Sequence, residues 1–148
     1  MIDKILSFIG QFHVHPILVH FPIALFISAL GLEMLAIVFK KEYLQDVSWT
    51  NFILAVLITP LVVLTGLLEA KGLHLSHKAA NIHKMFAFWT FGVSSICAIG
   101  LWIMQKKLSQ KLFRKLFFIS LVLVVILVLI CGYYGGRLVY EYGVGVSE

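Results

Sequence analysis

All six histidines of this sequence fall in two short stretches, and each stretch lies just ahead of a long apolar run. They are His13, His15, His20, His74, His77 and His83. Imidazole nitrogens bind transition metals and the axial positions of haem iron, whereas they gain nothing from contact with lipid. The histidines therefore predict metal or haem chemistry beside the apolar runs.

The apolar runs are long enough to cross a membrane. The chain has 148 residues, of which 61% are hydrophobic and only 13% are charged, and its mean hydropathy is +1.00. A water-soluble domain of this size could not bury so many apolar side chains. Four runs, at residues 16–39, 49–70, 82–104 and 113–136, can each span roughly 30 Å of hydrocarbon. The sequence predicts one all-α domain over residues 1–148, an integral membrane four-helix bundle with up-and-down topology.

The two ends of the chain carry patterns of their own. Residues 1–12 place apolar side chains on one side of a short helix, which predicts an N-terminal helix lying in the membrane interface. Gly135-Gly136 predicts the end of the fourth helix, and Gly143 and Gly145 then allow a Gly-rich tail to fold back over the outer face. No internal repeat is evident.

The basic residues indicate orientation rather than a nucleic-acid partner, although the net charge is +5. They lie in the loops next to apolar spans, with seven in the first and third loops and five on the opposite side. The positive-inside rule then predicts a multi-pass protein of the cell (inner) membrane with both termini extracytoplasmic. This topology places all six histidines on the outer side.

His20 and His83 are the pair we expect to bind a cofactor. Each stands above a strip of small residues at helical spacing, and helices one and three are diagonal in an up-and-down bundle. Two such histidines can supply both axial ligands of a haem b iron in the core. Gly66 and Gly136 lie at about the same level, where small residues give either room for a flat ligand or a close helix contact. The sequence lacks a C-x-x-C-H motif, which excludes covalently attached haem.

Several other residues belong to the expected site. Arg137, with Lys78 and Lys84, could meet haem propionates at the interface. Tyr140 would be carried toward the site by the tail. His15 and His77 could form a second, more exposed metal site or hydrogen-bond loop carbonyls.

Two acids and the cysteines complete the candidates. Glu33 lies in the inner third of helix one, where an ionisable group is costly and is either functional or satisfied by headgroups and the bundle. Glu69 could hydrogen-bond a ligand histidine or simply be solvated. Cys97 and Cys131 are predicted to be packing residues without a disulfide.

Two segments resemble the ends of a known family of membrane proteins. HPILVHFPIAL at residues 15–25 and GGRLVYEYGVGV at residues 135–146 are similar to the family catalogued as domain of unknown function 2231, and TGLLEA at residues 65–70 resembles its middle. The resemblance implies four transmembrane helices. Through relatives joined to c-type cytochrome domains, it also implies a place near electron transfer, without an established reaction. This chain has no cytochrome c domain of its own.

The expected function is that of a membrane-embedded b-type cytochrome. It would carry electrons near the extracytoplasmic surface and exchange them with a quinone or a periplasmic redox protein. The alternative is a non-redox protein that holds copper or zinc with the same histidines, with Met85 as a soft ligand. A structural subunit without cofactor and a homo-oligomer also remain open, as does the question of whether the protein is an enzyme.

Overall fold

Four long α-helices make up the computed structural model, which describes residues 14–72 and 78–144. They are α2 (Val14–Phe39), α3 (Glu42–Gly72), α4 (Lys78–Met104) and α5 (Gln110–Tyr140). All four are long and apolar enough to cross a membrane, so the predicted all-α class with four transmembrane helices is confirmed. The interfacial helix expected at residues 1–12 lies outside the described residues.

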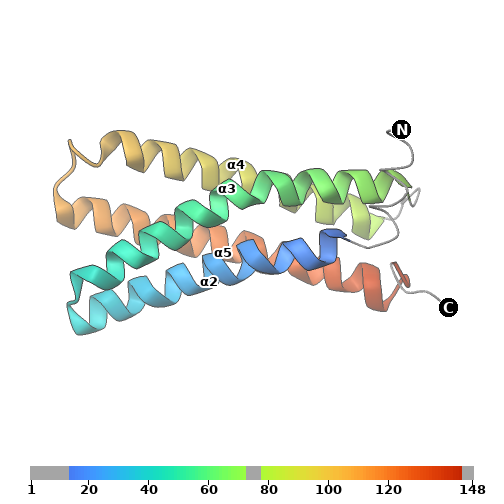
Figure 1. The fold of residues 1–148 in the computed structure, drawn as a ribbon, viewed down its shortest axis with the longest axis horizontal. Coiled ribbons are helices and arrows are strands. Elements are labelled where there is room, and N and C mark those ends of the chain that lie inside the picture. The colour runs from blue at the N-terminus through green and yellow to red at the C-terminus, as the bar shows by residue number, and fades with distance from the viewer. Residues whose placement is uncertain (1–13, 73–77, 145–148) are drawn as a thin grey trace.

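The helices run up and down along the long axis of the molecule (Figure 1). The turns that join α2 to α3 and α4 to α5 lie together at one end, which we call the loop end (residues 40–41 and 105–109). The other end holds the starts of α2 and α4 and the ends of α3 and α5, and we call it the histidine end. Each helix packs most closely with the other helix of its own hairpin, and α2 and α4 are diagonal, as predicted.

The C-terminal end of α5 differs from the sequence prediction, and this difference affects the site. α5 continues through Gly135 and Gly136 to Tyr140, so the predicted end at these two glycines is wrong. The chain turns instead at Gly143, whose φ is +63° and whose N–H donates to Val139 O at 3.1 Å. A glycine in this left-handed conformation is a common helix terminator, and Val144 then packs against the start of α4.

Aromatic side chains fill the middle of the bundle. Phe26, Phe52 and Phe117 are fully buried, and their rings meet edge to face with centroids 5.5 to 5.8 Å apart. Trp49 packs on Phe117 at 5.1 Å. Such clusters stabilise a bundle by close packing, because lipid is as apolar as the core and supplies little hydrophobic driving force.

The second hairpin repeats the burial pattern of the first. Residues at identical spacing are buried in α2 and α4, and again in α3 and α5. The pairs in α2 and α4 are Pro22 with Thr90, Phe26 with Ser94, and Glu33 with Leu101; those in α3 and α5 are Ser48 with Phe117, Phe52 with Leu121, Ala55 with Val124, and Thr59 with Val128. The residue types differ in every pair, which explains why no repeat is evident in the sequence.

Candidate functional site

Two histidines from the diagonal helices face each other at the histidine end. His15 comes from the first turn of α2 and His83 from the second turn of α4. Their ring centroids are 6.1 Å apart and the ring planes are inclined at 79°. Both rings are partly buried. Pairing of one histidine from helix one with one from helix three was expected from the sequence, with His20 rather than His15 as the first member.

Each of these rings is fixed by a backbone carbonyl of the neighbouring helix. His15 Nδ1 lies 3.0 Å from Val62 O of α3, and His83 Nδ1 lies 2.9 Å from Cys131 O of α5. A carbonyl only accepts, so the neutral rings carry their proton on Nδ1 and donate it. Nε2 of each ring then keeps a lone pair, which is the protonation that metal-binding histidines have when a second group orients them.

A glycine one turn beyond each carbonyl makes room for the ring. A Cβ added at Gly66 would lie 2.8 Å from His15 Cε1, and one added at Gly135 would lie 3.1 Å from His83 Cε1. The arrangement of histidine, carbonyl and glycine is thus the same in both hairpins. The separations along the chain between histidine and carbonyl residue are 47 and 48. The two histidines occupy equivalent places in the repeated hairpins.

A mainly apolar cavity adjoins the two rings on the bundle axis. Its volume is about 70 Å³, and all four helices contribute to its wall. The lining residues other than the histidines are Val19, Pro22, Ile23, Phe26, Thr59, Val62, Val63, Ala87, Thr90, Val128, Cys131 and Gly132. The hydroxyls of Thr59 and Thr90 donate to carbonyls of their own helices, so the cavity wall offers the two imidazoles as its principal free polar groups.

The part of the chain that contains His15 and His83 matches the profile of a known family. The profile of a family described as "Predicted membrane protein (DUF2231)" matches residues 11–148. The chain belongs to this family. The comparison with curated proteins found no match, and neither did the comparison with solved structures. The resemblance inferred from residues 15–25 and 135–146 is therefore confirmed.

His20 has a different environment in this DUF2231 protein. Its side chain is exposed on the outer surface of α2, and its Nδ1 lies 2.6 Å from Pro16 O of its own helix. It is five residues from His15, so the two side chains leave the helix in different directions. Whether His20 binds a cofactor is left as a prediction, but the ring that the fold brings to His83 is that of His15.

Arg137 and its neighbours also differ from the expected arrangement. Arg137 Nε and Nη2 donate to the carboxylate of Glu141 at 2.7 and 2.5 Å, and the guanidinium lies 6.0 Å from the Tyr134 ring centroid. These bonds lower the pKa of Glu141. Tyr140 is almost fully exposed, and a Cβ at Gly136 would contact nothing within 4 Å. Gly135, rather than Gly136, is the glycine that contacts a histidine.

The remaining candidates are placed as follows. Met85 is exposed and Glu69 interacts electrostatically with His15 across the α2–α3 hairpin. The Cys131 thiol sulfur lies 3.6 Å from His83 Nδ1. His13, His74 and His77, as well as the end of the tail, lie outside the described residues.

The two facing imidazoles are not part of a larger cluster of metal-binding side chains in the part of the chain that the structure describes. Within residues 14–72 and 78–144 there is no group of three or more His, Cys, Asp or Glu side chains that could hold a metal. Protein zinc sites use three or four such ligands. The geometry therefore offers two nitrogen donors on facing helices, a number that suits an axial pair.

The sequence placed His15 among the candidate cofactor-binding residues, but depth in the helix ranked His20 above it. The signal that would have ranked His15 first is a pair of glycines. Gly66 lies one turn after Val62, whose carbonyl faces His15, and Gly135 lies one turn after Cys131, whose carbonyl faces His83.

Proposed function

We propose that this protein is a membrane b-type cytochrome in which His15 and His83 are the two axial ligands of one haem. The observation that carries the proposal is the facing pair itself, with centroids 6.1 Å apart and each Nδ1 on a carbonyl. Each ring keeps an Nε2 without a proton, so the two histidines could hold one haem iron between diagonal helices, and the haem would supply a one-electron couple.

The number of donors favours haem over a bare ion. A porphyrin supplies four nitrogens of its own, so the protein needs to give only two ligands on opposite sides of the ring plane. His15 and His83 come from diagonal helices and meet that need. The carbonyls of Val62 and Cys131 hold the rings in place and raise the basicity of Nε2.

The protein would also have to admit the porphyrin. A cavity of about 70 Å³ is smaller than a haem, so binding requires the two hairpins to move apart at the histidine end. Contacts between hairpins are the weaker ones, and such a movement leaves each histidine on its own carbonyl and glycine.

A bound haem would supply a one-electron couple. The site lies in the first turn of α2 and the second turn of α4, so its cofactor would be near one membrane surface rather than at the centre. We propose that this surface is extracytoplasmic, in the cell membrane, and that a quinone or a periplasmic redox protein exchanges electrons there.

The cavity volume favours a second candidate. The cavity of about 70 Å³ that the two rings line is large enough for a single copper ion without any opening of the hairpins, and the Cys131 thiol close to His83 adds a soft donor. In this case the protein would hold or deliver a metal rather than carry electrons through a porphyrin.

Optical spectra of detergent-purified protein, expressed with haem in supply, test the proposal. Air-oxidised and dithionite-reduced samples should show a Soret band that shifts on reduction with sharp α and β bands, and a pyridine haemochrome assay should give one haem per chain. Metal analysis of the same sample distinguishes iron from copper or zinc.

Three alanine variants identify the ligands. His15→Ala and His83→Ala should each abolish haem retention, whereas His20→Ala, a histidine of the same helix that faces outward, should keep it. Loss in His20→Ala with retention in His15→Ala would restore the pair expected from the sequence. A colourless wild type with bound copper would support the second candidate and overturn the first.

A further inference from the structure

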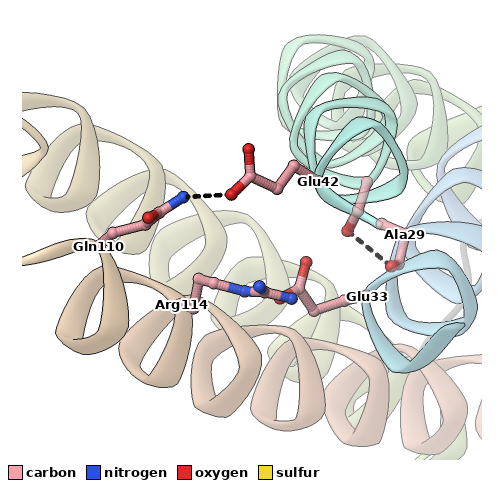
Figure 2. Close-up of polar contacts among 6 residues, drawn as sticks. Ala29, Glu33, Glu42, Gln110 and Arg114 are labelled. Atoms are coloured by element: carbon pink, nitrogen blue, oxygen red, sulfur yellow. Dashed lines mark hydrogen bonds and ion pairs between the residues drawn. The ribbon is translucent and has the colours of Figure 1, made fainter. Parts of the chain in front are cut away.

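The loop end of the bundle contains a polar groove far from the histidines. Its volume is about 340 Å³, and it is lined by Glu42 at the start of α3 and by Gln110, Lys111 and Arg114 in the first turns of α5. Glu42 and Gln110 meet through a 3.4 Å hydrogen bond above the Arg114 side chain (Figure 2). His15 and Glu33 are about 27 Å apart along α2, so this groove is separate from the candidate site.

A buried carboxylate stands directly behind the groove. Glu33 of α2 is fully buried, and Arg114 Nε approaches its Oε1 at 3.7 Å, which is longer than a charge-assisted hydrogen bond (Figure 2). Across the described helices, neither Glu33 oxygen nor Arg114 Nη2 has a hydrogen-bond partner. Nη2 is itself buried and closed to a ligand in the groove, so Arg114 lines the groove with the rest of its side chain, which is 26% exposed overall.

The charge around the groove is strongly positive. Residues 33–46 and 105–115, all of them described, carry seven lysine and arginine side chains and three carboxylates. An anion is therefore attracted to this end of the molecule. Arg114 and Lys111 are placed to bind it within the groove, and Glu42 is the acidic residue in the wall.

Exposed apolar side chains are close in sequence to the residues that line the groove. Phe39, Tyr43 and Leu112, which adjoin it in sequence, are all at least 44% exposed. The groove lies where membrane-length helices end, so these side chains lie at the depth where lipid headgroups meet acyl chains. A ligand with an anionic head and an apolar tail matches both features.

We propose that this groove binds the phosphodiester headgroup of an anionic phospholipid such as phosphatidylglycerol. A phosphate oxygen accepts a hydrogen bond from Lys111 Nζ, the positive charge of Arg114 attracts the phosphate, and a headgroup hydroxyl donates to Glu42. Glu33 does not contact the lipid; it is a positioning residue that holds the Arg114 guanidinium at the edge of the groove.

Native mass spectrometry of detergent-purified protein titrated with phosphatidylglycerol, phosphatidylethanolamine or phosphatidylcholine tests the proposal. One phosphatidylglycerol per chain should be retained in preference to the other two lipids. Lys111→Gln should weaken its binding about fivefold, the equivalent of roughly 1 kcal/mol per cation near a membrane surface. Lys106→Gln removes the same charge from the turn outside the groove and should change binding much less.

A second variant and a competitor make the test decisive. The double variant Glu33→Gln/Arg114→Gln leaves no unpaired buried charge, and it should fold, as circular dichroism would check, while losing the lipid preference. Equal loss in Lys106→Gln would show that only diffuse charge attracts lipid and would overturn the proposal. Displacement of phosphatidylglycerol by inorganic phosphate would assign the groove to a free anion instead and would overturn it as well.

Discussion

The two ends of the bundle differ in the hydrogen bonding of their polar groups. At the histidine end, equivalent histidines of the two hairpins donate to equivalent carbonyls. At the loop end, Glu33 from one hairpin meets Arg114 from the other, and three of their atoms have no hydrogen-bond partner among residues 14–72 and 78–144. The histidine end is symmetric and fixes each ring through Nδ1, whereas the loop end is asymmetric and leaves buried atoms of its ion pair without hydrogen bonds.

The repeated burial pattern shows how this difference arises. The positions equivalent to Glu33 and Arg114 in the opposite hairpins are Leu101 and Gln45, both buried. The core between the ends keeps the same spacing in both hairpins, but the loop end places one acid and one base where the repeat has neutral residues. A symmetric pair suits a ligand held from two opposite sides, and an asymmetric charged pair suits a ligand that approaches from one side.

The largest effect on stability should come from breaking the Glu33–Arg114 pair. Arg114→Leu leaves a fully buried carboxylate without its cation, and we expect a loss of roughly 3–5 kcal/mol in the free energy of unfolding. Glu33→Leu/Arg114→Leu should recover most of that loss, because the core then buries apolar groups. Denaturant unfolding in detergent measures both variants.

The same double variant tests whether the two ends are independent. Haem retention at the histidine end should be unchanged in Glu33→Leu/Arg114→Leu, since about 27 Å of helix and the aromatic core separate the two sites. A loss of haem in a folded double variant would show that the histidine end and the loop end are coupled and not independent.

A smaller effect should come from filling the space beside His15. Gly66→Ala places a Cβ 2.8 Å from the His15 ring, and we expect a loss of about 1–3 kcal/mol in stability together with weaker haem retention. Gly136→Ala is the matched control, because its Cβ would meet open space. The control should gain up to about 1 kcal/mol from better helix propensity. If the two variants behaved alike in thermal unfolding and haem content, the close approach of Gly66 to the His15 ring would have no role in the site.

The smallest effect concerns the exposed Arg137–Glu141 pair. Because Arg137 lowers the pKa of Glu141, the pair contributes stability above the unfolded pKa of this carboxyl and loses it as the pH falls through the folded pKa. Glu141→Gln should therefore reduce the acid dependence of thermal unfolding below about pH 4.5 without changing haem content. A change in haem content would show that Arg137 does serve the cofactor, as the sequence suggests.

Much of the fold could be predicted from hydropathy alone. A helix must satisfy its backbone within the bilayer, so four apolar runs of sufficient length fix four helices and their up-and-down order. The C-terminal end of α5 could not be found this way, because Gly135 has the character of a helix terminator although the helix continues to Tyr140. The glycine served to admit a ring from another helix.

The candidate site was predicted less completely for a related reason. His20 and His83 ranked first by their depth, and His83 is one of the two facing rings. The direction in which a side chain leaves a helix depends on helix rotation, which is set by packing against neighbours and not by hydropathy. That rotation turns His20 outward toward Pro16 O and His15 inward toward Val62 O.

The sequence by itself determined that this is a four-helix membrane protein of the DUF2231 family, because span length and local motifs are properties of the chain. Only the tertiary structure decided that His15 meets His83, that Gly66 and Gly135 make room for them, and that Glu33 meets Arg114. These contacts join residues about 50 to 80 positions apart: the glycine contacts form within each hairpin, and the His15–His83 and Glu33–Arg114 contacts form only once the two hairpins have packed together.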